Sequence, residues 1–222
     1  EKTAAIYGLG YAPDSWTKLT DYLIDKGFRR EELIIGGISG KSQSGKVYDR
    51  FRDRLMFPII DTRGLVLGFG GRKFEGEGAK YLNTSDTPVF NKRHNLFSLN
   101  FAKNHANGEL ILMEGYMDVI SLYQNGVKNA IASLGTAFTA EQARLISRYA
   151  GTVVLCYDTD EAGIKATERA IEVFEGINVK IKILNLPEGK DPDEFVKNRG
   201  GKAFLDLCRK AYTVGAYKLM ML

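Results

Sequence analysis

The second half of the chain alternates short apolar runs with segments of helical periodicity, and this alternation constrains the fold more than any other feature. Four apolar runs are typical of buried strands: LILM at 110–113, KNAIAS at 128–133, TVVLCY at 152–157 and VKIKILNL at 179–186. The segments between them predict helices, one of them capped by Thr139 and ended by Gly151. Strands joined by helices pair in parallel through right-handed crossovers. We therefore predict an α/β fold with a parallel sheet between two layers of helices, and a further helix beginning in DPDEF.

The first half is rich in glycine and in short β-prone runs. The segment PDSWTKLTDYLIDKGF predicts a helix that is capped by Asp14 or Ser15 and has Trp16 in its apolar stripe. The turn DTRG between two apolar runs predicts a hairpin within an antiparallel sheet. Residues 75–95 read as an irregular basic stretch. We expect a mixed, β-rich lobe at roughly 30–100.

Composition narrows the class of protein. The 222 residues include no apolar run near the ~18 residues that span a membrane and no signal-peptide pattern. The two cysteines and two histidines lack the spacing of a structural zinc site, so we expect no zinc, no disulfide framework and a cytoplasmic location. Any metal should be a hard ion held by oxygen. The first residue is not Met and the last lies in an expected helix, which indicates a piece of a longer protein.

Charge is distributed unevenly along the chain. The net charge is +4, and residues 41–103 contain twelve Lys or Arg against six Asp or Glu. A basic first half beside an acid-rich second half indicates a polyanion that meets metal ions. A solvated surface of uneven charge explains the same numbers, so charge alone leaves both interpretations open.

Acidic residues follow three of the four predicted parallel strands. They are Glu114 after the first strand, Asp158 and Asp160 after the third, and Asp191 and Asp193 a few residues after the fourth. Open α/β sheets bind ligands outside the carboxyl ends of their strands. Clustered carboxylates repel one another, and a divalent cation such as Mg²⁺ removes that penalty. Residues i and i+2 of an extended DTD or DPD segment point to the same side. The pattern predicts a metal site that supports in-line attack at phosphorus.

Helix capping is the simpler explanation for any one of these acids. Asp193 would then cap the last helix, and Asp158 would serve a turn. Five acids at three strand ends, on the same side of one sheet, are harder to explain in this way, and they favour metal binding. Asp118 lies four residues after Glu114 at a predicted helix start. It is either an outer ligand or an acid that the helix dipole favours.

Four segments around these acids form one ordered set: EGYMDVISLYQNG, ASLGTAFT, CYDTDEAGIKATERA and GKDPDEF. Together they resemble the Toprim domain of bacterial DnaG-type primases. Before them, DRFRDRLMFPI, GFGGR and KYLNTSDTPVFNK resemble the basic N-terminal subdomain of the DnaG polymerase core. The likeness covers about residues 10–210. It implies a mixed α+β basic subdomain at 1–104, a Toprim-type parallel sheet flanked by helices at 105–189, and the start of a helical subdomain at 190–222.

The resemblance implies a nucleotidyltransferase: a DNA-directed RNA polymerase that makes short RNA primers from ribonucleoside triphosphates on single-stranded DNA during replication. It implies Mg²⁺ or Mn²⁺ as cofactor, and a replicative helicase as partner through a C-terminal domain outside these residues. The family's catalytic acids match Glu114, Asp158 and Asp160, and its metal-associated acids match these three with Asp191, Asp193 and, as a supporting acid, Asp118. The family's basic ridge matches Arg52, Arg54, Arg72, Lys80, Tyr81, Asn83 and Lys92.

The residue types of this ridge suit single-strand binding in their own right. Arg and Lys bind phosphates irrespective of base sequence. Tyr81, between Lys80 and Asn83, either stacks on a base, worth ~1–3 kcal/mol, or packs half-buried in a loop. The glycines of GFGGR let the backbone bend beside Arg72, and they lack the spacing of a nucleotide-binding glycine loop.

Two alternatives stay open at the level of sequence. One is a Toprim nuclease or topoisomerase; a topoisomerase needs a nucleophilic tyrosine, and none of the eleven tyrosines stands in a local signature. The other is a non-catalytic DNA-binding module that keeps the Toprim shell. The retained Glu114 and both Asp pairs argue against a degenerate shell.

Overall fold

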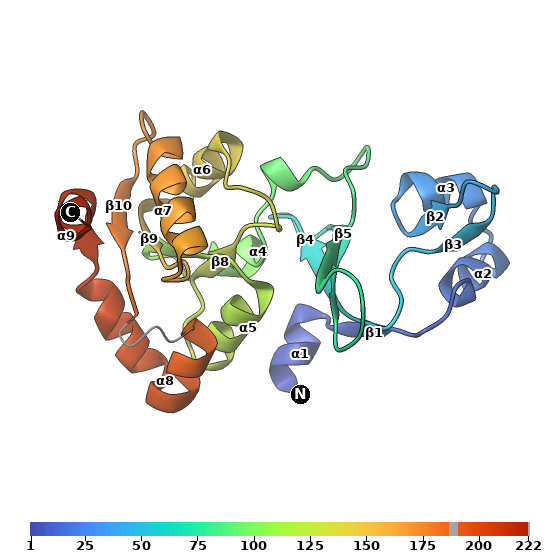
Figure 1. Ribbon diagram of the computed structural model, residues 1–222, viewed down its shortest axis with the longest axis horizontal. Helices are drawn as coiled ribbons and strands as arrows, with labels where there is room; N and C mark the ends of the chain where they lie inside the picture. The colour runs from blue at the N-terminus through green and yellow to red at the C-terminus, as the bar shows by residue number, and fades with distance from the viewer. Residues whose placement is uncertain (187–190, 222) are drawn as a thin grey trace. The chain divides into compact units, whose positions relative to one another are not determined.

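The computed structural model describes residues 1–186 and 191–221 and forms two compact units (Figure 1). The first unit comprises residues 1–60 and 65–92. The second comprises residues 61–64 and the described residues from 93 onward. The division predicted between residues 189 and 190 lies outside the described residues.

The first unit is built on an antiparallel sheet with the strand order β1-β4-β5-β6. Its strands are β1 (Gly10–Ala12), β4 (Arg54–Ile60), β5 (Val66–Lys73) and β6 (Tyr81–Asn83). The remaining elements are the pair β2 (Ser39–Lys41) and β3 (Val47–Asp49) and the helices α1 (Lys2–Tyr7), α2 (Lys18–Asp25) and α3 (Arg30–Ile35). The predicted β4–β5 hairpin is present, and Gly64 adopts a φ of 93° in its turn. Strand β6 corrects the expectation that 75–95 is irregular throughout.

Helix α2 begins later than predicted. It starts after Thr17, its N-cap, so neither Asp14 nor Ser15 is the N-cap residue, although the Ser15 hydroxyl accepts the backbone N–H of Lys18 at 3.2 Å. Trp16 precedes the helix and is 63% exposed, so it is not part of an apolar helix stripe. Two backbone N–H groups in the first turn donate to the carboxylate of Asp49, each at 2.8 Å. This cap comes from a residue distant in sequence, which no local pattern reveals.

The second unit contains a five-stranded sheet with the order β11-β10-β9-β7-β8. Its four parallel strands, all predicted, are β7 (Gly108–Met113), β8 (Ala130–Ala132), β9 (Ala150–Leu155) and β10 (Lys180–Ile183). The edge strand β11 (Tyr212–Thr213) pairs antiparallel with β10. Gly151 lies inside β9 and is not a helix stop as predicted, because the preceding helix ends earlier. Cys156, directly after β9, is buried in the core.

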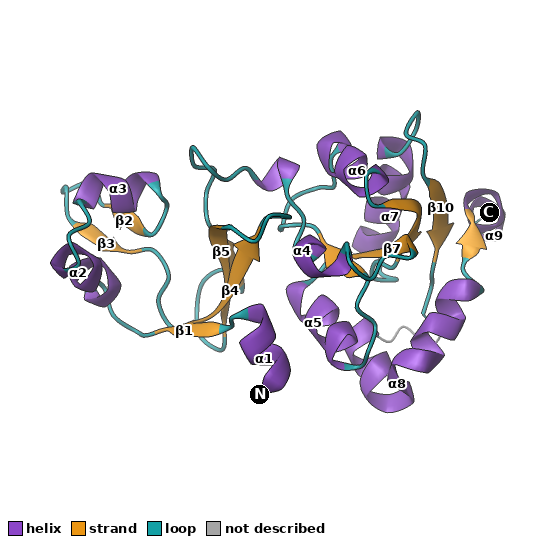
Figure 2. Cartoon of the chain, turned by 180° about the vertical axis from the view of Figure 1, so that it is seen from behind, coloured by secondary structure: helices purple, strands orange, loops and turns teal. Residues whose placement is uncertain are grey.

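Helices cover both faces of this sheet (Figures 1 and 2). They are α4 (Leu99–Ala102), α5 (Tyr116–Gln124), α6 (Ala140–Ser147), α7 (Glu161–Val173), α8 (Pro192–Arg209) and α9 (Val214–Met220), with the short 3₁₀ helix η1 (Lys92–His94) before them. Strands β8 and β9 lie on opposite sides of β7, so right-handed crossovers put α5 on one face and α6 and α7 on the other. Leu110 and Leu112 pack with residues of α6 and α7, and Ile111 and Met113 are buried on the opposite face. Strands buried on both faces read as continuous apolar runs.

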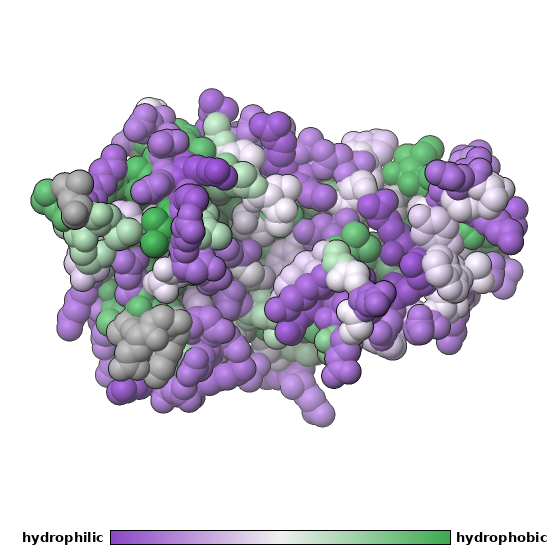
Figure 3. Space-filling view, in the orientation of Figure 1, coloured by the Kyte–Doolittle hydropathy of each residue, from purple (hydrophilic) through white to green (hydrophobic). Residues whose placement is uncertain are grey.

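The outer surface of α7 is mostly hydrophilic (Figure 3), while Ala170 and Ile171 on its inner side are buried. This is the pattern of a helix that packs one face on a sheet and presents the other to water. Within the described residues, no helix combines the length and apolarity needed to cross a membrane.

Candidate active site

Glu114 and Asp158 follow the two central strands of the parallel sheet. Strand β7 ends at Met113, directly before Glu114, and β9 ends at Leu155, shortly before Asp158. The chain leaves β7 toward β8 on one side and later returns to β9 on the other side, so the strand order reverses between β7 and β9. Open α/β sheets bind their ligands at such a point, because the two adjoining loops turn away from each other and leave a crevice.

The Glu114 carboxylate connects these two loops. Its Oε1 accepts a hydrogen bond from the backbone N–H of Asp158 at 3.2 Å. Partial burial raises the pKa of Glu114 and the charges of Asp158 and Asp160 raise it further, while this hydrogen bond opposes the rise. Burial also raises the pKa of Asp158, together with repulsion from Asp160 and Asp191. These carboxylates are therefore close enough to repel one another.

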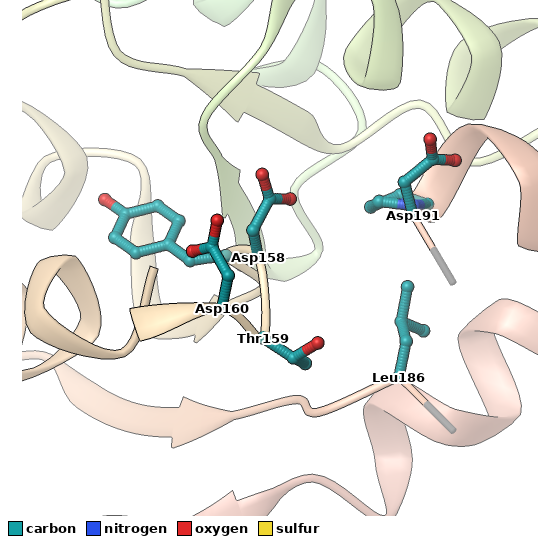
Figure 4. A pocket seen from close by; sticks show the side chains of 7 residues that line it. Asp158, Thr159, Asp160, Leu186 and Asp191 are labelled. Carbon is teal, nitrogen blue, oxygen red and sulfur yellow. The ribbon is translucent and has the colours of Figure 1, made fainter. Parts of the chain in front are cut away.

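The DTD segment presents two carboxylates to one side. In Figure 4, Asp158 and Asp160 point the same way and Thr159 points the opposite way, which is the alternation predicted for an extended segment. Asp160 Oδ1 accepts the backbone N–H of Gly163 at 2.8 Å and so caps helix α7. Asp160 is therefore the acid of this loop that caps a helix, whereas Asp158 lies nearer the end of strand β9.

Gly163 allows this loop to fold tightly onto the start of α7. A Cβ atom at Gly163 would lie 2.0 Å from the backbone oxygen of Asp158 and 2.6 Å from its carbonyl carbon. Any side chain at this position would push the Asp158 backbone away. In the sequence, the only signal for the role of Gly163 is its place three residues after Asp160.

The acids of the DPD segment lie at the start of α8. Asp191 Oδ1 accepts the backbone N–H of Glu194 at 2.6 Å and is the N-cap. The alternative in which Asp193 caps this helix does not hold, because Pro192 occupies the first helical position and the cap is Asp191, directly before it. Asp193 instead contacts Lys197 Nζ at 2.6 Å, one turn further along the helix.

Asp118 lies in the first turn of α5, close to the other acids. Burial raises its pKa from the usual 3.8 to about 7, and the charges of Asp191, Asp158 and Asp193 contribute. A Cβ atom at Gly115 would lie 2.5 Å from Asp118 Oδ2, so the glycine leaves room for this carboxylate at the helix N-terminus. Asp118 thus shares the electrostatic environment of the acids from the β9 loop and from α8.

A cavity of about 250 Å³ opens among some of these acids (Figure 4). It is lined by Tyr157, Asp158, Thr159, Asp160, Leu186, Asp191 and Pro192. Glu114, Asp118 and Asp193 are not among its lining residues. Across the part of the chain that the structure describes, no three Asp, Glu, His or Cys side chains are spaced to enclose a metal ion. The site is an open set of carboxylates rather than a closed cage.

Three residues of the predicted basic ridge share one face of the sheet in the first unit. Arg72 on β5 lies opposite Tyr81 on β6, and Gly70 lies opposite Asn83. Directly paired residues and residues two apart on one strand lie on the same face, so Arg72, Tyr81 and Asn83 line that face together. Gly70 and Phe57, its partner on β4, are both buried, so this part of the face is covered. Tyr81 is 38% exposed, which keeps its ring accessible.

Two other arginines of the ridge hold the first unit together. Arg54 is buried, and its guanidinium donates to the backbone oxygens of Gly71, Ala79 and Lys80. The guanidinium of Arg52 lies 3.9 Å from the ring centroid of Trp16. Both side chains thus have structural contacts that their basic character did not predict.

The last two ridge residues, Lys80 and Lys92, lie on either side of segment 81–91. Lys80 is exposed and immediately precedes β6. Lys92 lies in η1, and its backbone N–H donates to Asp86 at 3.3 Å. Arg50, also a basic residue of this unit, donates to the Ser85 hydroxyl, and its buried Nε atom has no hydrogen-bond partner among the described residues.

Comparison with known proteins gives these features a family. Residues 1–103 match a family model described as the DNA primase catalytic core, N-terminal domain, and residues 111–196 match one described as Toprim-like. A solved structure of the DnaG primase catalytic domain bound to single-stranded DNA is 36% identical, with a TM-score of 0.91, over 100% of this chain and 73% of that one. This chain belongs to the DnaG primase family. The catalytic core of the Escherichia coli primase is 37% identical, also with a TM-score of 0.91, and the chain covers 72% of it.

Other DnaG primases show how much of a whole protein this chain represents. The DNA primase of Clostridium acetobutylicum is 46% identical over 220 residues, which is 99% of this chain and 37% of that protein. The DNA primase of Deinococcus radiodurans is 44% identical over 196 residues, and the match covers 34% of it. The chain therefore spans about a third of the length of these curated relatives and corresponds to part of a DnaG catalytic core.

Proposed function

We propose that this chain carries the nucleotidyl-transfer centre of a DNA-directed RNA polymerase that makes short RNA primers on single-stranded DNA. One observation carries the proposal: Glu114 and Asp158 meet where the strand order of the sheet reverses, joined by a 3.2 Å hydrogen bond. In a chain of the DnaG family, this geometry supports phosphoryl-transfer chemistry at that point.

The donor set suits Mg²⁺ or Mn²⁺. The proposed ligands are all carboxylates, namely Glu114, Asp118, Asp158, Asp160, Asp191 and Asp193. Hard divalent ions prefer such oxygens, and Mg²⁺ usually keeps several waters and takes further oxygens from substrate phosphates. Because no three of these side chains are spaced to enclose an ion among the described residues, we propose that waters and nucleotide phosphates complete its coordination. When bound, such ions would lower the pKa of the attacking hydroxyl and offset charge on the leaving pyrophosphate.

The chain's own residues orient the reaction. The proposed reaction joins a 3′-hydroxyl to the α-phosphate of the next ribonucleoside triphosphate and releases pyrophosphate. We assign Glu114, Asp158 and Asp160 as the catalytic acids, because the contact between the β7 and β9 loops and the α7 cap hold these carboxylates in place. Asp191 and Asp193 approach from α8, and Asp118 supports the site from α5.

The basic ridge of the first unit would bind the template and the triphosphate. Arg72, Tyr81 and Asn83 share a sheet face, and an aromatic ring between cations and amides suits a stacked base beside a phosphate. Lys80 and Lys92 would add phosphate contacts. Arg54 would act by holding the backbone of Ala79 and Lys80 in place, and Arg52 would keep its charge beside Trp16.

The wider setting is also a proposal. Single-stranded DNA and ribonucleoside triphosphates are the proposed ligands, since one solved relative is described as bound to single-stranded DNA. We propose contact with a replicative helicase through residues outside this chain, and a location at the replication machinery of the bacterial cytoplasm. We also propose functional subdomains at 1–104, 105–189 and 190–222.

A priming assay tests the function. The chain is supplied with single-stranded DNA, Mg²⁺ or Mn²⁺ and labelled ribonucleotides, and short RNA products are expected. Glu114→Gln and Asp158→Asn should lose these products, whereas Asp206→Asn, an exposed acid of α8 paired with Arg209, should keep them. Nicked or relaxed DNA without RNA would replace the proposal with a nuclease or topoisomerase. DNA binding without either product would indicate a non-catalytic module.

A further inference from the structure

Helix α8 is broken at Gly200. Its φ of 78° and ψ of 164° are not helical, so the helix consists of two segments that meet at this residue. This region of backbone conformation is accessible almost only to glycine. A Cβ atom at Gly200 would meet nothing within 4 Å, so the requirement for glycine here comes from the backbone alone.

The next residue, Gly201, packs directly against the end of α5. A Cβ atom at Gly201 would lie 2.0 Å from the backbone oxygen of Asn125 and 3.0 Å from Val127 Cγ2. Asn125 is the C-cap of α5, and a backbone oxygen cannot rotate away as a flexible side chain would. A larger residue at Gly201 must therefore push the two helices apart.

This contact lies at one end of two helical segments whose other ends carry acids. Helix α5 begins beside Asp118, and the first segment of α8 begins beside Asp191 and Asp193. The two helices lie side by side in both views (Figures 1 and 2). At 1.5 Å per helical residue, Asp118 lies roughly 10 Å along α5 from Asn125, and Asp193 lies no more than roughly 12 Å along α8 from Gly201. A shift at that contact is carried to Asp118 along the continuous helix α5, and it reaches the acids of the first α8 segment through the break at Gly200.

We infer that Gly200 and Gly201 are positioning residues for the acidic site: Gly201 sets the distance between α8 and α5, Gly200 sets the direction of the first α8 segment, and together they hold Asp191 and Asp193 near Asp118. Neither glycine touches the acids themselves. The inference deepens the proposed function and rests on it, because it assumes that the α8 acids help to hold a divalent ion.

The test measures Mn²⁺ binding by electron paramagnetic resonance, together with thermal unfolding in metal-free buffer. Gly201→Ala adds the clash with Asn125, and Gly200→Ala strains the break without adding a clash. Gly215→Ala is the matched control, since it is also a helical glycine, in α9, with no atom within 4 Å of an added Cβ. Asp191→Asn and Asp193→Asn report separately on whether the α8 acids bind the ion.

We expect Gly201→Ala and Gly200→Ala to weaken Mn²⁺ binding by about tenfold or more, as the loss of supporting contacts around a metal commonly does. Gly215→Ala should bind Mn²⁺ like the parent. In the priming assay, excess Mn²⁺ should restore product formation in the glycine variants, which a general loss of folding would not allow. If Gly201→Ala shows no cooperative unfolding, Gly200→Ala carries the test.

The outcomes distinguish a failure of the glycine proposal from a failure of the metal-site assignment. If the Asp variants lose affinity while both glycine variants bind Mn²⁺ normally, Gly200 and Gly201 do not position the site. If Asp191→Asn and Asp193→Asn themselves bind normally, the assignment of the α8 acids fails, whatever the glycines do.

Discussion

The Oε1 atom of Glu114 accepts the backbone N–H of Asp158 at 3.2 Å, and this contact joins the loops that follow the two central strands. Glu114 thus has two separable roles: it holds the Asp158 backbone through an oxygen atom, and it contributes a negative charge. A substitution that keeps the oxygen and removes the charge distinguishes them.

Glu114→Gln should lower Mn²⁺ affinity by about 10- to 100-fold and leave the fold intact. The amide oxygen still accepts the Asp158 N–H. Loss of the Glu114 charge also removes its repulsion with the carboxylates of Asp158 and Asp160. The unfolding temperature in metal-free buffer should therefore be equal to or above that of the parent. Parent-like Mn²⁺ affinity in this variant would exclude Glu114 from the metal site.

Asp160 allows the capping and metal-binding explanations to be compared in one residue. Asp160→Asn keeps a good N-cap for α7 but loses the charge, so we expect weaker Mn²⁺ binding at unchanged stability. Asp160→Ala loses the cap as well, and should also unfold more easily by about 1 kcal/mol. Chemical denaturation and Mn²⁺ titration measure both quantities. If Asp160→Asn binds Mn²⁺ like the parent, the residue is a helix cap only.

Asp118 should make the metal-free protein less stable as pH rises. Its pKa is about 7 in the folded chain against a usual 3.8, so between these values the unfolded chain releases a proton that the folded chain retains. Stability falls through this window and is level above it. Asp118→Asn removes the effect, so it should exceed the parent by on the order of 1–3 kcal/mol at pH 8 and match it near pH 4.

Thermal unfolding across that pH range, with a chelator present, measures the difference. Asp206→Asn serves as the control, since its exposed carboxylate lies on α8 beside Arg209. A constant gap between Asp118→Asn and the parent at every pH would show that Asp118 does not titrate in this window.

Gly163→Ala should displace the acids of the β9 loop. The added methyl would lie 2.0 Å from the Asp158 backbone oxygen, so the loop must move, and a shift of about 1 Å in a reactive group can cost about 100-fold in rate. Gly151→Ala, in strand β9 with nothing within 4 Å of the new atom, is the matched control. Priming and Mn²⁺ titration of the two variants provide the comparison. Equal activity in both would mean that the loop tolerates the methyl group.

Arg72→Ala and Lys80→Ala should weaken single-strand binding and reduce its dependence on salt. Each phosphate contact contributes about 0.7 to the slope of log affinity against log salt for single strands, so each variant should lose roughly that amount. Arg29→Ala, whose charge is already paired with Glu32, should leave the slope unchanged. Fluorescence anisotropy at several salt concentrations gives the slopes. A parent-like slope in both ridge variants would remove them from the DNA path.

Local pattern was sufficient for much of the second unit. The apolar runs before Glu114 and Asp158 predicted strands β7 and β9, because strands buried on both faces lack polar residues. Strand β6 was missed, since its three residues form a strand only by pairing with β5. The cap of α2 was missed for the same kind of reason, because Asp49 reaches it from a distant part of the chain.

Local sequence pattern did not predict which acid of each pair caps a helix. The sequence favoured metal binding for these acids, and in the capping alternative it placed Asp193 at a helix cap and Asp158 in a turn. The structure assigns the caps to Asp160 and Asp191, because the cap depends on where each helix begins, and helix boundaries shift by a residue or two with packing.

By itself, the sequence determined the order of strands and helices and which acids follow which strands, since periodicity and turn chemistry act over a few residues. Only the tertiary structure decided that β7 lies beside β9, that Glu114 reaches the Asp158 backbone, and that burial raises the pKa of Asp118. The same holds for the contact between Gly201 and Asn125. These properties depend on burial and on distances between segments far apart in the chain, which only long-range packing sets.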